Sequence, residues 1–288
     1  MAELPAKLDA AVRSVAARLA QVGIEPAFTE ARVIFELAGF DRMALLKAPD
    51  EVLNAIQTSI ILSALEKRLS GMPVARIRGW SWFDGRRFEL SAETLEPRDD
   101  TLALVDAVMD FVRTTPNCRI LDIGTGTGII ALTLLARVPH AVALATDISE
   151  GALETAKRNG LALGFGARLR VQKADMLDEI EEQFDLIISN PPYIASKVVK
   201  QLTREVRDHD PLAALDGGMD GLEFYRRIAK DAGKLLAPNG RVAVEIGFDQ
   251  RASVSAIFVE AGLSALSFHK DLGDRPRALV FTQFKQPC

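Results

Sequence analysis

The chain has 288 residues, of which 48% are hydrophobic and 26% charged, a composition typical of a globular protein that is long enough for two domains. A formal net charge of −4 argues against general attraction to nucleic acid or anionic membrane, and we expect neither a signal peptide nor a membrane span. The two cysteines (Cys118, Cys288) and three histidines (His140, His209, His269) are scattered, so we expect no disulfide and no metal site in a cytoplasmic protein.

The first 71 residues predict a small bundle of helices joined by short loops. Apolar residues recur at helical spacing, as in Leu8, Val12, Val15 and Leu19. The expected helices are residues 5–22, 27–38, 41–46 and 50–69. We interpret residues 1–71 as an N-terminal domain. The residues alone leave open whether it is a lid, a partner-binding surface or a packing element.

Residues 72–95 predict a linker built around a β-hairpin. Asp84-Gly85 is a favoured two-residue turn with aromatic residues on both sides. A charged loop from Glu96 to Thr101 follows, and then a helix is predicted over residues 102–113. Arg98 becomes a candidate cofactor-binding residue if this loop lies over a site.

Residues 96–288 are interpreted as the second domain, in which strands and helices alternate. The expected strands are residues 119–123, 141–146, 167–173, 184–189, 241–246, 263–270 and 277–284, and the expected helices are residues 129–137, 150–163, 222–236 and 251–261. This alternation predicts an α/β fold with a parallel sheet covered on both faces. Ligands of such sheets bind beyond the carboxyl ends of the strands, near the switch in strand order.

A glycine-rich turn joins the first of these strands to its helix. Its candidate cofactor-binding residues are Asp122, Gly124, Thr125, Gly126, Thr127 and Gly128. Glycine allows positive φ and lets a ligand approach the backbone closely. A dinucleotide site is the competing interpretation, but the spacing is not Gly-x-Gly-x-x-Gly, and the Asp122 carboxylate would repel a pyrophosphate. The turn therefore favours a ligand with an amine or sulfonium group.

Two further acidic residues follow the next two strands. Asp147 is placed to accept hydrogen bonds from ribose hydroxyls, and Ile148 beside it belongs to the same predicted site. Asp175 is placed to meet an adenine amino group, with Met176 packing on the ring. Each aspartate alone is as well explained as a helix cap or a turn residue. Together, the three strand ends indicate S-adenosylmethionine, which carries adenine, ribose and an amino acid but no phosphate.

The fourth strand runs directly into Asn190-Pro191-Pro192-Tyr193. The two prolines lack N–H donors and fix their own φ, so the backbone after Asn190 is stiff and leaves the sheet. An amide, carbonyls outside a ladder and an aromatic ring suit a planar, nitrogen-bearing group. We take Asn190, Pro191, Pro192 and Tyr193 as candidate catalytic and substrate-binding residues, and Asn190 also as a candidate cofactor-binding residue; a plain proline turn is the alternative.

With these residues in place, the second domain resembles the class I S-adenosylmethionine-dependent methyltransferases, which implies a seven-stranded, mostly parallel sheet. Asn190–Tyr193 is similar to the signature of amino-methyltransferases acting on adenine N6 of DNA, guanine N2 of ribosomal RNA or glutamine N5 of proteins. Further stretches look like the release factor glutamine methyltransferase family. They are residues 73–88, Glu96–Thr101, Glu205-Val206, Asp210-Pro211, residues 214–218 and 220–222, Glu245-Ile246-Gly247 with Gln250, and Asp271-Leu272-Gly273 with Arg275.

This resemblance implies methyl transfer to the glutamine of the Gly-Gly-Gln motif of peptide chain release factors, with the N-terminal domain contacting the factor and no direct nucleic-acid partner. The Asn190 side-chain oxygen and the Pro191 carbonyl would accept the two N–H groups of the substrate amide, and Tyr193 would pack against it. The family's loop typically reads Arg-Pro-Asp-Thr-Glu, whereas Asp99 and Leu102 replace its proline and glutamate here. The alternatives are a paralogue acting on another protein, such as a ribosomal protein, a nucleic-acid amino-methyltransferase, or a regulator without chemistry.

Overall fold

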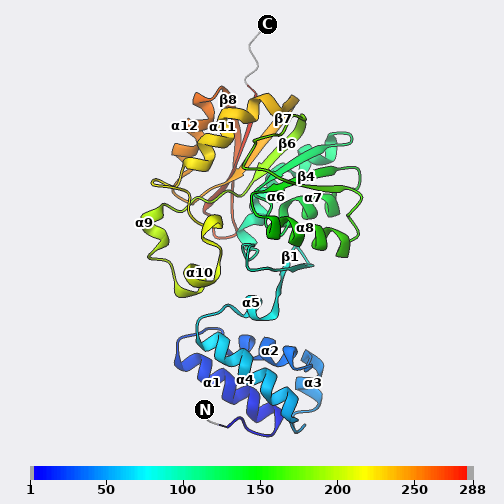
Figure 1. Ribbon diagram of the computed structural model, residues 1–288, viewed down its shortest axis with the longest axis vertical. Coiled ribbons are helices and arrows are strands. Elements are labelled where there is room, and N and C mark those ends of the chain that lie inside the picture. The colour runs from blue at the N-terminus through cyan, green and yellow to red at the C-terminus, as the bar shows by residue number, and fades with distance from the viewer. Residues whose placement is uncertain (1–2, 284–288) are drawn as a thin grey trace. The chain divides into compact units, whose positions relative to one another are not determined.

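The computed structural model describes residues 3–283, which divide into two compact units (Figure 1). The helical unit comprises residues 3–80 together with Arg204–His209. The sheet unit comprises residues 81–203 and 210–283. The predicted domain boundaries after residues 71 and 95 stay predictions. Cys288 and the end of the strand predicted over residues 277–284 lie outside the described residues.

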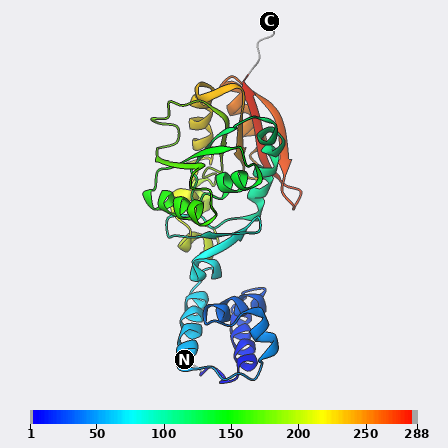
Figure 2. The same ribbon diagram turned by 90° about the vertical axis from the view of Figure 1, so that its right-hand side faces the viewer.

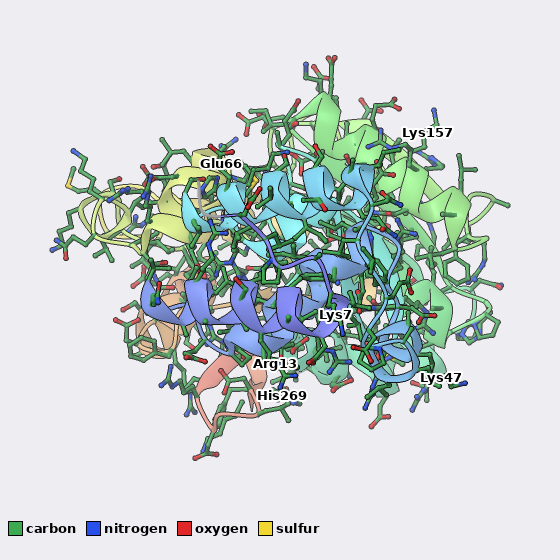
Figure 3. All side chains as sticks on the ribbon, turned by 90° about the horizontal axis from the view of Figure 1, so that it is seen from below. Lys7, Arg13, Lys47, Glu66, Lys157 and His269 are labelled. Atoms are coloured by element: carbon green, nitrogen blue, oxygen red, sulfur yellow. The ribbon has the colours of Figure 1, made fainter. Side chains whose placement is uncertain are left out.

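The helical unit is built from helices whose apolar faces meet in one core. The helices are α1 (Leu8–Gln21), α2 (Ala27–Leu37), α3 (Arg42–Lys47), α4 (Ala55–Leu69), α5 (Val74–Arg78) and α10 (Arg204–His209). Val15, Phe35 and Ile61 are fully buried in this core. Charged side chains such as Lys7 and Arg13 lie on its surface (Figure 3). This is the amphipathic arrangement that the helical spacing predicts.

Capping explains why α3 and α4 begin where they do. The Asp41 carboxylate accepts the Ala44 N–H at 2.7 Å, and Asn54 and Gln57 form a reciprocal capping box at the start of α4. The predicted fourth helix began at residue 50, five residues too early. Val52 instead forms an isolated β-bridge with Lys7.

Arg68 places α10 in the helical unit, although that helix lies far along the chain. The Arg68 side chain is 4% exposed, and its guanidinium donates to the carboxylates of Glu30 and Glu205. The Nη2–Oε1 distance to Glu205 is 2.5 Å. A buried charge needs partners of this kind. The pairing therefore ties α10 to α2 and α4.

The predicted hairpin is confirmed as β1 (Trp80–Phe83) and β2 (Arg86–Glu89). Asp84 and Gly85 both have positive φ, as a tight two-residue turn requires. The Asp84 carboxylate accepts hydrogen bonds from Arg86 and from Arg137, the last residue of helix α7 (Ile129–Arg137).

The sheet unit contains seven strands in the order β5-β4-β3-β6-β7-β9-β8 (Figures 1 and 2). The strands are β3 (Arg119–Ile123), β4 (Val142–Asp147), β5 (Leu169–Lys173), β6 (Phe184–Ser189), β7 (Leu236–Glu245), β8 (Leu263–Lys270) and β9 (Pro276–Gln283). All neighbours pair in parallel except β7 with β9 and β9 with β8. The predicted seven-stranded, mostly parallel sheet is thus confirmed.

Helices cover both faces of this sheet. They are α6 (Leu102–Thr114), α7 (Ile129–Arg137), α8 (Glu150–Ala162), α11 (Glu223–Leu235) and α12 (Arg251–Glu260). Apolar residues of α6 and α7 form one core cluster, and those of α11 and α12 form another on the opposite side of the strands (Figure 1). None of the helices among residues 3–283 combines the length and hydropathy needed to cross a membrane.

The switch in strand order falls between β3 and β6. The chain runs outward from β3 through β4 to β5, and then returns to place β6 on the other side of β3. In the parallel register, Ile123 lies beside Ser189. The glycine turn after β3 and the Asn190 segment after β6 therefore emerge next to each other, where ligands of such sheets bind.

Candidate active site

The glycine turn after β3 is shaped for close approach to its backbone. Gly124, Gly126 and Gly128 all have positive φ. A Cβ added at Gly124 or Gly126 would meet no atom within 4 Å, whereas one at Gly128 would lie 2.9 Å from Leu132 Cδ1. The first two glycines thus border open space, and the third allows α7 to pack. Thr125 and Thr127 are buried beneath the turn.

Asp122 supports this turn from below instead of facing the open space, which differs from the expectation of a carboxylate close to the ligand. Its side chain is fully buried, and Oδ2 accepts hydrogen bonds from the Thr125 hydroxyl at 2.7 Å and the Ala131 N–H at 3.2 Å. Oδ1 has no hydrogen-bond partner within the described part of the chain. Burial raises the pKa of Asp122 to about 7, because it disfavours the charged form.

Asp147 lies where the sequence predicts, at the carboxyl end of β4. Its Oδ2 accepts the Gly126 N–H at 3.0 Å and its Oδ1 accepts the Ser149 N–H at 2.9 Å, so the aspartate is tied to the glycine turn. Each carboxylate oxygen retains lone pairs for further donors. The neighbouring Ile148 side chain is 58% exposed, an apolar surface beside the carboxylate.

Asp175 and Met176 follow β5, but the structure gives Asp175 a protein partner. Its carboxylate lies 2.7 Å from Nη2 of Arg227 on α11. Met176 adopts positive φ, which is uncommon for a residue with a side chain, and packs partly against the core under α11.

The Asn190–Tyr193 segment leaves β6 under tight constraint. The Ser189 hydroxyl donates to the Ile123 carbonyl at 2.9 Å, and Asn190 Nδ2 donates to Thr101 Oγ1 at 3.4 Å. Gln250 Nε2 donates to the Tyr193 carbonyl at 2.9 Å. Burial, with the nearby Glu245 charge as a smaller cause, raises the pKa of Tyr193 to about 12, so its phenol stays neutral.

A second loop with glycines packs directly against this segment. A Cβ at Gly217 would lie 2.7 Å from the Pro192 carbonyl oxygen, and one at Gly221 would lie 2.4 Å from the Tyr193 carbonyl oxygen. The loop is held by the Ile194 carbonyl, which accepts the Gly217 N–H at 2.8 Å. Only glycine allows this approach of two backbones.

Arg98 lies on the sheet unit with its side chain about half exposed. Its Nη2 lies 3.1 Å from Oδ2 of Asp210, whose carboxylate is 1% exposed. No contact in the described part of the chain joins Arg98 to the glycine turn.

Comparison with known proteins decides the family. A model of the PrmC N-terminal domain matches residues 10–79, and a model of the methyltransferase small domain matches residues 103–208. The chain is 44% identical to the release factor glutamine methyltransferase of Agrobacterium fabrum, covering 92% of this chain and 93% of that relative. It is 40% identical to that of Bradyrhizobium diazoefficiens, covering 94% and 93%. The chain belongs to the release factor glutamine methyltransferase family.

The fold of this methyltransferase is also that of more distant enzymes. The hMettl16 catalytic domain is 19% identical and matches 81% of this chain and 83% of that chain with a TM-score of 0.56. This likeness concerns the fold alone. It supports the class I architecture, in which the site lies at the switch in strand order.

Sequence reasoning missed two buried charged residues near the Asn190–Tyr193 segment. Glu245 ends β7 and is 2% exposed, and Arg277 on β9 is 7% exposed. Arg277 Nη2 lies 3.0 Å from carboxylate oxygens of both Asp100 and Asp271. Glu245 stands in a stretch that resembles the family, and its acidic side chain inside an apolar strand was a usable signal. Nothing in the local sequence distinguishes Arg277.

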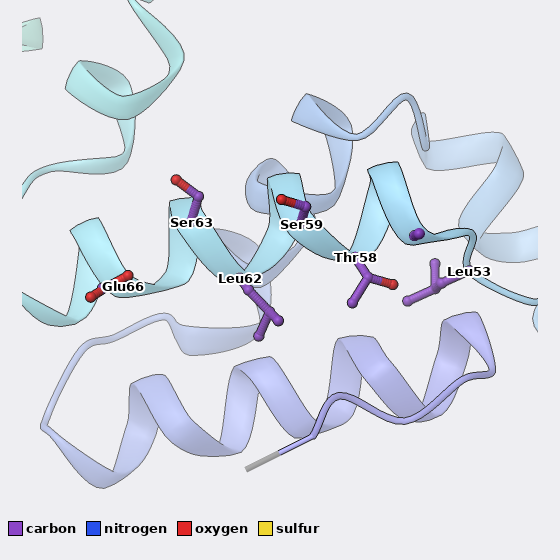
Figure 4. A pocket seen from close by; sticks show the side chains of 7 residues that line it. Leu53, Thr58, Ser59, Leu62, Ser63 and Glu66 are labelled. Atoms are coloured by element: carbon purple, nitrogen blue, oxygen red, sulfur yellow. The ribbon is translucent and has the colours of Figure 1, made fainter. Parts of the chain in front are cut away.

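The helical unit of the methyltransferase has a hollow of its own beside α4, with a volume of about 570 Å³ (Figure 4). It is lined by residues such as Leu53, Thr58 and Leu62. None of the predicted site residues lies in it. Among the described residues, Glu66 is the one charged residue of its lining, beside small hydroxyl and aliphatic side chains.

Proposed function

We propose that this methyltransferase transfers a methyl group from S-adenosylmethionine to the side-chain amide nitrogen of the glutamine in the Gly-Gly-Gln motif of peptide chain release factors. Family membership over 92% of the chain supports this substrate. The observation that carries the chemistry is the emergence of the Asn190–Tyr193 segment beside an open glycine turn at the switch point. A cytoplasmic location, where translation takes place, belongs to the same proposal.

The residues around the glycine turn fit the proposed cofactor. Gly124 and Gly126 leave open space at their Cα positions, Asp147 can accept ribose hydroxyls, and Ile148 offers an exposed apolar surface. When bound, S-adenosylmethionine supplies an electrophilic methyl group on a positively charged sulfur. Asp122 acts indirectly, by holding the turn through Thr125.

The proposed site also includes three residues with no hydrogen bond to the glycine turn in the described part of the chain: Asp175, Met176 and Arg98. The Asp175 carboxylate keeps lone pairs for an adenine amino group despite its pairing with Arg227. Met176 offers its thioether side chain at the edge of the core. Arg98 belongs to a loop whose Thr101 contacts Asn190.

The Asn190–Tyr193 segment can position an acceptor nitrogen that is a poor nucleophile. An amide nitrogen is a poor nucleophile because its lone pair is delocalised into the carbonyl. The Asn190 side-chain oxygen and the Pro191 carbonyl accept its two N–H groups, and Tyr193 packs against its plane. The nitrogen held by Asn190 and Pro191 would gain the cofactor's methyl group through a new N–C bond and release one proton to water, with the electron pair of the broken methyl–sulfur bond kept by sulfur. Orientation of this kind is worth up to about 7–11 kcal/mol in intramolecular models.

Substitution of Asn190 by alanine tests this role. We expect Asn190→Ala to lower the transfer rate by at least about 100-fold, because the acceptor nitrogen is no longer held in line. The affinity for S-adenosylmethionine, measured by calorimetry, should stay close to that of the wild type, because the Asn190 amide donates to Thr101, which lies outside the glycine turn. An active variant would refute the assignment.

Substrate choice is tested by offering labelled S-adenosylmethionine with purified release factor, ribosomal proteins, ribosomal RNA and DNA in parallel. Label on the Gly-Gly-Gln glutamine supports the proposal. Label on a ribosomal protein alone would favour a paralogue, for which Asp99 and Leu102 are the motivating departures. Label on nucleic acid alone would overturn the protein-glutamine assignment. The net charge of −4 opposes such a nucleic-acid substrate.

A further inference from the structure

The sheet register places a buried carboxyl group directly behind Asn190. Ser189 of β6 pairs with Val244 of β7, so Asn190, the first residue after β6, lies beside Glu245, the last residue of β7. Together with Thr101, these two residues form a cluster. Thr101 ends the charged loop and is 1% exposed. Asn190 Nδ2 donates to its hydroxyl oxygen at 3.4 Å.

The donors and acceptors of this cluster determine the orientation of the Asn190 side-chain amide. Burial raises the pKa of the Glu245 carboxyl group, whereas hydrogen bonds from Thr101 and Asn190 lower it. Because the Thr101 oxygen accepts the Asn190 N–H, its own O–H is free to donate to Glu245, which keeps an acceptor oxygen whether or not it is protonated. With Nδ2 committed in this way, Asn190 Oδ1 is directed away from Glu245.

We propose that Glu245 is a positioning residue for methyl transfer, which acts through Thr101 to hold the Asn190 amide with its oxygen toward the acceptor. This inference rests on the proposed function, because the substrate amide must find an acceptor at that oxygen. Glu245 itself touches neither the acceptor nor the methyl group. Glu245 determines that Oδ1 of Asn190, and not Nδ2, faces the acceptor.

The buried Glu245 side chain lowers the free energy of unfolding. A role in stabilising the fold therefore does not explain it, whereas a positioning role does. Its Oε2 has no hydrogen-bond partner within the described residues, and its main counter-charge, Arg277, is shared with Asp100 and Asp271. A buried acceptor without a partner destabilises a protein. Replacement by an apolar side chain of similar volume should therefore preserve or raise stability while releasing Asn190.

The test compares Glu245→Met, Glu245→Gln, Thr101→Val and a matched control. We expect Glu245→Met and Thr101→Val each to lower kcat about 100-fold, with unchanged affinity for S-adenosylmethionine. Glu245→Gln keeps an acceptor oxygen and should recover most of the activity. The control is Thr133→Val, since Thr133 is also fully buried and its hydroxyl has no partner in the described structure, and its kcat should equal that of the wild type. The double variant Glu245→Met/Thr101→Val should be no slower than either single variant, because both break one chain.

Three outcomes would overturn the inference. They are wild-type kcat in Glu245→Met, wild-type kcat in Thr101→Val, or a loss of activity that follows a loss of stability in urea unfolding. If Glu245→Met fails to fold, Thr101→Val and its control decide alone. A wild-type enzyme that transfers no label to release factor refutes the proposed function instead, and the same variants are then compared on the substrate that it does label.

Discussion

Gly217 and Gly221 set the distance between two backbones that meet behind Tyr193. At both positions the absence of a side chain shapes the site, although the glycine takes no part in the chemistry. The sequence places both glycines in a family-like stretch, but only the structure shows that they face the Pro192 and Tyr193 carbonyls. Glu245 and Asp122 are comparable, because their burial depends on contacts between segments far apart in the chain.

Gly217→Ala should displace the Asn190–Tyr193 segment. The new methyl group would lie 2.7 Å from the Pro192 oxygen and 2.8 Å from the Tyr193 Cα, both of them backbone atoms that cannot rotate away. We expect a loss of about 1–3 kcal/mol in the free energy of unfolding and a fall in kcat. Urea unfolding and the methylation assay measure the two effects.

Gly233→Ala provides the matched control for that prediction. Gly233 lies within α11, and an added Cβ would meet nothing within 4 Å. Alanine there should raise the free energy of unfolding by about 0.5–1 kcal/mol and leave kcat unchanged. Equal effects of the two substitutions would show that the close backbone approach does not matter.

At the scale of elements, segments with an unbroken apolar pattern or a clear turn or capping signal were predictable, and short helices without such a signal were not. The strand and helix after Cys118, β3 and α7, have the predicted bounds, because their apolar patterns are unbroken. The loop after Tyr193 was predicted without helices, yet it contains α9 (Ser196–Val199), the 3-10 helix η2 (Leu212–Ala214) and α10. Segments of three to six residues have too few positions to show a period, and tertiary contacts such as that of Arg68 hold them.

Glu205→Ala should loosen α10. Its carboxylate is the only α10 partner found for the buried Arg68 guanidinium among the described residues, so the substitution removes the charged contact that holds this short helix. We expect trypsin to cleave after Arg204 and Arg207 roughly tenfold faster, which corresponds to about 1.4 kcal/mol. The control is Asp231→Ala on α11, which removes a carboxylate paired with the exposed Lys234 and should leave cleavage after Arg204 and Arg207 unchanged. Equal cleavage of wild type and Glu205→Ala would contradict the anchoring role.

At the scale of the whole molecule, the alternation of strands and helices predicted the fold class and placed the site at the carboxyl ends of the strands. The glycine turn, Asp147 and the Asn190 segment all lie at the predicted strand ends. What the alternation does not contain is the strand order. The placement of β7 beside β6 brings Glu245 to Asn190, and that of β9 beside β7 brings Arg277 to Glu245. These pairings join residues separated by more than thirty positions, so no local pattern encodes them.

Two of the buried carboxyl groups, Asp122 and Glu245, give the folded protein a characteristic pH dependence. Burial raises the pKa of Asp122 and of Glu245 to about 7 each, from ordinary values of 3.8 and 4.5. The folded state therefore holds protons that the unfolded chain has already lost, and the free energy of unfolding should fall as the pH rises from about 4.5 to about 7. The contribution of Glu245 is on the order of 3 kcal/mol, opposed by Arg277 and reinforced by Asp100.

Urea unfolding of wild type and Glu245→Gln across this pH range measures that contribution. The difference in stability between the two proteins should grow in favour of the variant as the pH rises, because glutamine does not ionise. Other titrating groups, including Asp122, cancel in the comparison. A constant difference from pH 4.5 to 7.5 would mean that Glu245 ionises in the folded protein as it does in water, and the buried cluster behind Asn190 would then be open to solvent.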